Sequence, residues 1–199
     1  MSLSEVLIHE LPTPVFDASI RVQNVVSSAT LNQKFDLNAI VKGNCLVEYR
    51  PEKFPGLVFR LKKPKTAILI FSTGKMVCTG AKSENESKKA VLKVVRELKK
   101  SGIIIPGKPE TKIVNIVATA NLLGRIELED CAYSLERTMY EPEQFPGLVY
   151  RMNDPKVVIL LFASGKLVCT GATKEEDVYT AVDKLHKTLE EKELICYDE

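Results

Sequence analysis

The apolar residues of the chain follow first the period of a strand and later the period of a helix. From Ser19 the side chains alternate with period two, which is typical of a strand. A short helix is predicted at Phe35–Val41, and apolar positions return with helical spacing from Ser83 until Gly102 ends the helix. Further strands are predicted at 45–49, 57–61, 66–71 and 75–81. Prolines and glycines between these runs predict turns.

The whole pattern occurs twice. Residues 54–80, FPGLVFRLKKPKTAILIFSTGKMVCTG, return at 145–171 as FPGLVYRMNDPKVVILLFASGKLVCTG, with 17 of 27 positions identical. The same spacing pairs Asn24 with Asn115 and needs no gap from about Val22 to Leu189. Self-similarity at a fixed spacing indicates a tandem duplication of one unit. Each unit is predicted to contain a strand, a short helix, four strands and a long helix.

The duplication divides the chain into segments. We expect a flexible N-terminal lead at 1–18, a first repeat at 19–105, a linker at 106–110, a second repeat at 111–190 and an acidic tail at 191–199. Ser83-x-x-Glu86 and Thr173-x-x-Glu176 match the capping box, so we expect both long helices to begin there.

The predicted strands are apolar on both faces. In 66–71, Ile68 and Ile70 lie on one face while Leu69 and Phe71 lie on the other. One long helix per unit covers only one face of a sheet, so the other is predicted to be an open apolar interaction surface. The alternative is a three-layer domain with both faces buried, but the chain has no spare helices for the second layer.

Composition narrows the class of protein. A chain of 199 residues with 45% hydrophobic and 27% charged residues is typical of a globular protein. No apolar run approaches a membrane span, and we expect no signal peptide. Five cysteines without a CxxC pattern predict a reduced, intracellular protein with no thiolate metal site. Cys78 and Cys169 are interpreted as small core residues, and no cofactor or metal is expected.

Charge is distributed unequally between the halves. Residues 1–109 have 18 basic and 9 acidic side chains, a net +9, whereas 110–199 have 10 and 17, a net −7. Such asymmetry indicates an interaction surface, although drift on solvated faces is the alternative. The turn Arg50-Pro51-Glu52-Lys53 becomes Glu141-Pro142-Glu143-Gln144 in the second repeat, which predicts a partner-binding role for Glu141 and Glu143.

The chemistry of the predicted open face fits the minor groove of DNA. Asn and Thr among apolar side chains suit the acceptors on A·T pairs, while the extra amino group of G·C pairs obstructs close contact. Arg and Lys at the rim suit phosphates. Phe54 and Phe145 lie in proline-flanked turns, and Phe71 and Phe162 close neighbouring strands, as wedges between base steps would require.

The repeated motif FPGLV[FY]R…PK…F-x-[ST]-GK-x-V-C-TG resembles the TATA-box-binding proteins, general transcription factors of archaea and eukaryotes, from Ser19 to Leu189. The resemblance implies an α+β fold: a pseudo-twofold saddle of two tandem repeats, in which a curved ten-stranded antiparallel sheet has helices on its convex face and DNA on its concave face. Members of this family insert apolar side chains between base steps and kink the duplex.

The resemblance also implies roles for individual residues. The intercalating pairs are Phe54 with Phe71 and Phe145 with Phe162. The base and groove contacts are Asn24, Asn115, Thr79, Thr170, Val26, Val77, Val117, Val168, Leu69 and Leu160. The phosphate contacts are Arg60, Lys75, Arg151 and Lys166. Thr173 replaces Lys82 in the second repeat and removes one expected contact.

The implied partners are promoter DNA, a transcription factor B-like protein bound at the second turn and, indirectly, RNA polymerase. The bare length and acidic end look archaeal, which implies a cytoplasmic, nucleoid-associated location, or a nuclear one in a eukaryote. Three alternatives remain open: a DNA-bending relative with no role in initiation, a protein-binding sheet module that includes a homodimer of the free protein, and an enzyme. Only His9 and His186 are available as histidines, and Ser72-Thr73-Gly74-Lys75 lacks the frame of a phosphate-binding loop, so we expect no catalysis.

Overall fold

The computed structural model describes residues 19–43 and 47–197, so the lead predicted at 1–18 lies outside the described residues. The first repeat contains β1 (Arg21–Thr30), α1 (Leu37–Gly43), β2 (Val47–Glu48), β3 (Leu57–Leu61), β4 (Thr66–Ile70), β5 (Lys75–Ala81) and α2 (Glu84–Lys100). The second contains β6 (Glu110–Asn121), β7 (Arg125–Ile126), α3 (Leu128–Ser134), β8 (Thr138–Met139), β9 (Gly147–Met152), β10 (Val157–Phe162), β11 (Lys166–Ala172), α4 (Glu175–Glu191) and β12 (Ile195–Cys196).

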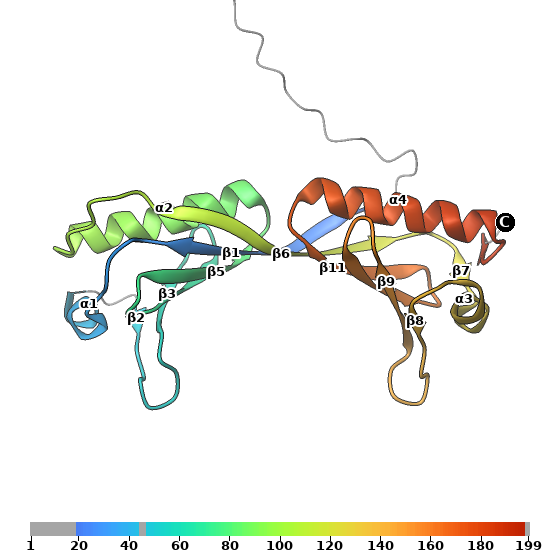
Figure 1. The fold of residues 1–199 in the computed structure, drawn as a ribbon, viewed down its shortest axis with the longest axis horizontal. Coiled ribbons are helices and arrows are strands. Elements are labelled where there is room, and N and C mark those ends of the chain that lie inside the picture. The colour runs from blue at the N-terminus through green and yellow to red at the C-terminus, as the bar shows by residue number, and fades with distance from the viewer. Residues whose placement is uncertain (1–18, 44–46, 198–199) are drawn as a thin grey trace, which may run out of the picture.

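Ten strands form one antiparallel sheet in the order β2-β3-β4-β5-β1-β6-β11-β10-β9-β8. The long strands β1 and β6 pair at its centre and join the two repeats. Figure 1 shows α2 and α4 on one side of this sheet, while the β2–β3 and β8–β9 loops project to the other. We call these loops, residues 49–56 and 140–146, the first and second stirrups. The predicted α+β saddle is confirmed.

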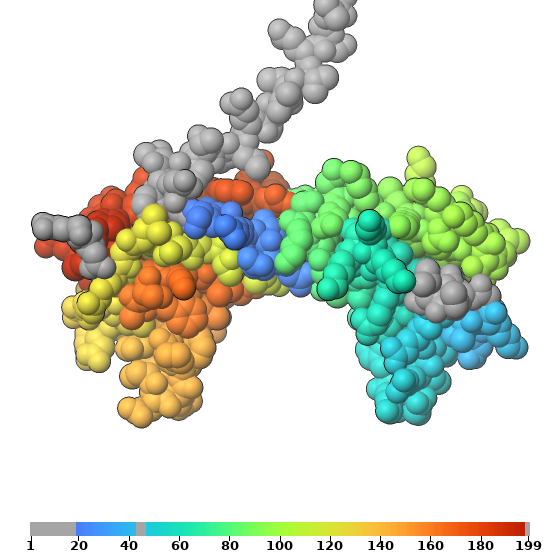
Figure 2. Space-filling view, turned by 180° about the vertical axis from the view of Figure 1, so that it is seen from behind, coloured from blue at the N-terminus to red at the C-terminus, as the bar shows by residue number. Residues whose placement is uncertain are grey.

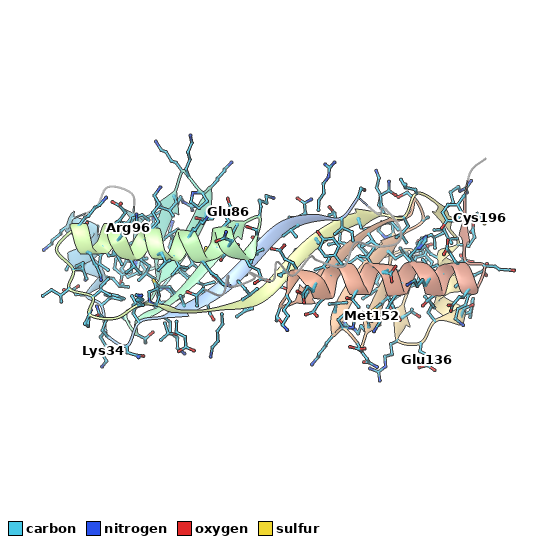
Figure 3. All side chains as sticks on the ribbon, turned by 90° about the horizontal axis from the view of Figure 1, so that it is seen from above. Lys34, Glu86, Arg96, Glu136, Met152 and Cys196 are labelled. Carbon is cyan, nitrogen blue, oxygen red and sulfur yellow. The ribbon has the colours of Figure 1, made fainter. Side chains whose placement is uncertain are left out.

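The helices cover one face of the sheet, as predicted. Ile68, Ile70, Met76 and Cys78 are fully buried beneath α2, whereas Leu69 and Val77 on the opposite face are only partly buried. Two hydrophobic cores result, one centred on each repeat, and the core of the second repeat also includes Val25 and Ala81 of the first. Viewed from above, α2 and α4 lie nearly end to end over the sheet (Figure 3). The described residues include no helix long and apolar enough to span a membrane.

Local chemistry shifts some predicted boundaries. The short helix begins at Leu37 rather than Phe35, because the Asp36 carboxylate accepts hydrogen bonds from the backbone N–H groups of Asn38 (3.0 Å) and Ala39 (3.2 Å). The strand predicted at 66–71 ends at Ile70, which leaves Phe71 at the start of a turn. Within the tail predicted at 191–199, Ile195–Cys196 form β12 and pair with β7, a small second sheet that the sequence reasoning missed.

The long helices begin differently. Ser83 caps α2 by accepting a hydrogen bond from the N–H of Glu86 (3.1 Å), as the capping box predicts. The second predicted box is wrong, because Lys174 occupies the N-cap of α4 and makes no side-chain cap. Instead the two helices cap each other where they meet. The N–H of Glu84 donates to Glu175 Oε1 (3.0 Å), and the N–H of Glu175 donates to Glu84 Oε1 (3.2 Å).

Candidate nucleic-acid interface

The face opposite the helices consists of cross-strand rows of side chains. In the first repeat, Leu69 of β4 lies between Val58 of β3 and Val77 of β5. The second repeat has the matching row Val149, Leu160 and Val168. Directly opposed residues of an antiparallel pair share one face, so each row forms a continuous apolar strip. The structure therefore brings together the predicted groove contacts of both repeats, and it adds Val58 and Val149, which the period-two alternation of β3 and β9 could have identified.

The two asparagines lie at the centre of this face. Asn24 of β1 pairs with Val117 of β6, and Asn115 pairs with Val26, so the four residues are arranged with pseudo-twofold symmetry. Thr79 and Thr170 contact the two amides: the Asn24 amide nitrogen donates to Thr79 Oγ1 (3.1 Å), and Thr170 donates to Asn115 Oδ1 (3.3 Å).

The orientation of both amides is fixed by the backbone. The N–H of Gly80 donates to Asn24 Oδ1 (2.7 Å), and the N–H of Gly171 donates to Asn115 Oδ1 (2.8 Å). A backbone N–H only donates, so the acceptor atom of each side chain must be the one it meets. Gly80 and Gly171 have φ of +96° and +97°, a conformation that favours glycine and occurs beside irregularities in the strand register. The N–H₂ group of each amide is thereby the end that can meet a ligand, although one N–H of Asn24 is already donated to Thr79.

The four phenylalanines form two matching pairs. The ring centroids of Phe54 and Phe71 are 5.8 Å apart with planes at 65°, and those of Phe145 and Phe162 are 5.8 Å apart at 66°. This edge-to-face geometry is favourable for aromatic rings. Phe54 and Phe145 are each 38% exposed, so an apolar edge at each end of the face is open to a ligand.

Glycine in the FPG motif makes room for each pair. A Cβ atom added to Gly56 would lie 2.7 Å from the ring of Phe54 and 3.0 Å from that of Phe71. Gly147 has the same relation to Phe145 and Phe162. An approach of 2.7 Å is shorter than real Cβ contacts, and one of 3.0 Å is tighter than most of them. This explains why the motif combines phenylalanine with a glycine two positions later.

Basic residues border the face. Arg60, Lys75, Arg151 and Lys166 are all exposed, and Arg60 and Arg151 extend the rows of Thr79 and Thr170. Lys166 and Phe162 line a hollow of about 580 Å³ together with Arg21. The rim is therefore cationic beside an apolar floor.

The two stirrups have matching backbone hydrogen bonds but different charges. Phe54 N–H donates to Arg50 O and Phe145 N–H donates to Glu141 O, both at 3.0 Å. Arg50 also forms an exposed ion pair with Glu48 (3.1 Å), whereas the corresponding residues of the second repeat are Glu141 and Met139. Figure 2 shows the stirrups as two separate lobes, each accessible at its tip.

Cys78 and Cys169 are core residues, as predicted. Cys78 and Cys169 are fully buried, and burial raises the pKa of both thiols, that of Cys169 to about 12. They therefore remain protonated core residues. Within 19–43 and 47–197, no cluster of three or more His, Cys, Asp or Glu side chains could hold a metal ion.

The fold and this face define a class: duplicated α+β saddle proteins whose helices cover one face of a shared sheet and leave the other open. A family model described as transcription factor TFIID (or TATA-binding protein, TBP) matches residues 19–101 and 110–192. The chain belongs to the TATA-binding protein family.

Individual relatives agree. A TATA-box-binding protein of Pyrodictium occultum is 55% identical over 168 residues, 84% of each chain. One from Methanothermobacter thermautotrophicus is 52% identical over 179 residues, which is 90% of this chain and 99% of its own length. The solved structure of Methanococcus jannaschii TBP is 50% identical and matches with a TM-score of 0.79, covering 86% of this chain and 98% of that one.

Replacing Gly147 with alanine should separate the Phe145–Phe162 pair. The new Cβ forces both rings to move, and because Phe145 is partly exposed the chain should stay folded. We expect nuclear Overhauser contacts between the two rings to disappear while the amide spectrum of the core is retained. Gly107→Ala is the matched control, since no atom lies within 4 Å of its added Cβ. Unchanged ring contacts in Gly147→Ala would contradict this account of the motif.

Proposed function

We propose that the chain is a general transcription factor that binds the minor groove of A·T-rich TATA-box promoter DNA, kinks it with its two phenylalanine pairs and recruits a transcription factor B-like protein. The observation that supports this most is the central pair of asparagines. Their oxygens accept hydrogen bonds from the backbone N–H groups of Gly80 and Gly171, so the amide N–H₂ groups are the ends left to meet a ligand, apart from the one N–H that Asn24 donates to Thr79. Membership of the TATA-binding protein family supports the same function.

The minor groove is the ligand that this face fits. A·T pairs offer only acceptors there, adenine N3 and thymine O2, which pair with the amide donors of Asn24 and Asn115. The apolar rows fit the sugar edges of a widened groove. The exposed Arg60, Lys75, Arg151 and Lys166 are then placed for phosphates, which contribute affinity but little sequence information.

The exposed phenylalanines are suited to kinking the DNA duplex. Apolar side chains wedged between base steps unstack them at a cost of a few kcal/mol per step, and the bent duplex then contacts more protein surface. A pair of rings at each end of the apolar face gives two kinks with the A·T-rich segment between them. Without DNA, the same apolar surface can pair with a second copy of the chain.

Replacing Asn115 with aspartate should abolish specific binding without unfolding the chain. One carboxylate oxygen keeps the hydrogen bond from Gly171, while the other replaces a donor with an acceptor facing the groove acceptors. We expect a loss of about 1–3 kcal/mol or more in affinity for an A·T-rich duplex, measured by fluorescence anisotropy beside a G·C-rich duplex. Asn121→Asp is a control outside the central pair. If the wild-type protein does not prefer the A·T-rich duplex, the proposed function is wrong.

Replacing Phe145 and Phe162 together with alanine should reduce DNA bending more than protein stability. Both rings are partly exposed on the open face and lie outside the fully buried core. We expect lower end-to-end energy transfer in a doubly labelled duplex at saturating protein. Phe54→Ala with Phe71→Ala should do the same at the other kink. Wild-type transfer at saturation in both variants would eliminate intercalation by these residues.

A partner must distinguish the two ends of a nearly symmetric saddle. We assign this role to the second stirrup, where Glu141 and Glu143 present two carboxylates on an exposed turn. A basic surface of a transcription factor B-like protein would complement them, and RNA polymerase would join through that factor. Individual exposed ion pairs contribute only about 0.2–1 kcal/mol, but complementary charge fixes register and partner choice.

Glu141→Arg with Glu143→Arg should leave DNA binding and bending intact and abolish recruitment of the factor. Both side chains lie at the stirrup tip, away from the rows of the open face. A gel shift on one promoter duplex, with and without the factor, measures both effects. The matched control is Arg50→Glu with Lys53→Glu, which reverses the charge of the first stirrup. This variant should recruit the factor as the wild-type chain does. A ternary complex at wild-type concentrations in the first variant would place the docking surface elsewhere.

A further inference from the structure

One interaction on the open face is present in the first repeat and replaced at both ends in the second. Lys82 Nζ donates to the backbone oxygen of Gln23 (2.6 Å) and lies 3.5 Å from its side-chain Oε1. The corresponding residues of the second repeat are Thr173 and Val114. The side chains at both positions therefore differ between the repeats, and the 3.5 Å approach of the ammonium group to an amide oxygen has no counterpart in the second repeat.

These residues border a hollow of about 550 Å³ in the open face. Its lining includes Gln23, Asn24, Ala67, Thr79 and Lys82. The floor residue Ala67 is small, whereas its counterpart in β10 is Val158. Val114 replaces Gln23 and is 47% exposed. The first repeat thus offers space and polar atoms where the second offers two branched apolar side chains.

The amide of Gln23 has a defined orientation. An ammonium group only donates, so the atom facing Lys82 is the amide oxygen. The amide nitrogen on the other side donates to Thr119 Oγ1 (2.9 Å). At 3.5 Å, Lys82 polarises the oxygen without saturating its two lone pairs. Gln23 Oε1 is consequently an acceptor in the wall of the hollow.

An acceptor at this position matches one atom of the minor groove. The guanine N2 amino group is the only base donor there, and it is also the group that obstructs close contact by an apolar face. Asn24 and Asn115 present donors, which cannot satisfy it. Gln23 can accept from it, and the space above Ala67 can contain it.

We propose that the first repeat admits a G·C pair, whose guanine N2 donates to Gln23 Oε1, and that Val114 and Val158 exclude such a pair from the second repeat. Gln23 is then a specificity-determining residue and Lys82 positions its amide. The consequence is directional binding: a site with one G·C pair is bound with that pair under the first repeat. The inference rests on the proposed minor-groove function.

The test starts from a palindromic A·T-rich duplex. One series of duplexes has a single G·C pair at a given distance from the centre, and a second series has two G·C pairs at that distance, one on each side. The distance is varied from one duplex to the next. The wild-type chain can place a single G·C pair under its first repeat, so at the matching distance it should raise Kd less than about threefold. When both G·C pairs are present, one of them must lie under the second repeat. This second pair should raise Kd about tenfold further, which is the scale of one groove contact.

Exchanging the side chains at these positions between the repeats tests whether they determine which repeat admits a G·C pair. In the variant Gln23→Val with Lys82→Thr, a single G·C pair should already lower the affinity for the duplex about tenfold, and the mirror-related pair should lower it about tenfold again. Val114→Gln with Thr173→Lys should lower the cost of the second pair. Inosine in place of guanine lacks the N2 group, so two I·C pairs should be bound about tenfold more tightly by the wild-type chain than two G·C pairs.

Equal costs for the first and second G·C pair in the wild-type chain, or equal affinity for guanine and inosine, would overturn the inference. Either result leaves the preference for an all-A·T duplex over a G·C-rich one intact. Loss of that preference would instead refute the proposed function, so the two failures are distinguishable.

Discussion

The pairing of β1 with β6 is the constraint on which the rest of the structure depends. Because these central strands hydrogen-bond across the repeat boundary, two half-sheets become one surface. Each repeat supplies one long helix, and both helices lie on the same side. The uncovered side is then a single continuous face, with asparagines at the centre and phenylalanine pairs at both ends.

The core and the open face use the same strands in alternation. In β5, the buried Met76 and Cys78 pack beneath α2, while the alternate residues Val77 and Thr79 point to the open face. A shift of one residue in register would exchange the two sets. The irregularities near Gly80 and Gly171 are tolerated because they turn one N–H out of the ladder and toward an asparagine. Stability and recognition are thus specified by one pattern with period two.

Much of this was predictable from the sequence, because duplication makes every strong signal appear twice. The buried face of β4 and β5 and the four phenylalanines followed from periodicity and turns. What could not be predicted depends on contacts between distant segments. The start of α4 is stabilised by Glu84, 91 residues away, so the local capping-box pattern at Thr173 does not identify the group that caps this helix. The short apolar run Leu194-Ile195-Cys196 carries no sign that β7 would pair with it. The amide orientation of Gln23 depends on Lys82, which only the folded sheet brings near.

The mutual caps of Glu84 and Glu175 have an implication for the history of the chain. The backbone N–H of each glutamate donates to the Oε1 atom of the other, so the two contacts are reciprocal. Such isologous contacts are those that two identical subunits make about a twofold axis. A single repeat would lack the neighbouring glutamate carboxylate, which α2 has in addition to its Ser83 cap, and a partner for its central strand. A second copy of the same repeat would supply both. The helix junction therefore has the form of a homodimer interface contained within one chain, as a tandem duplication of one repeat would produce.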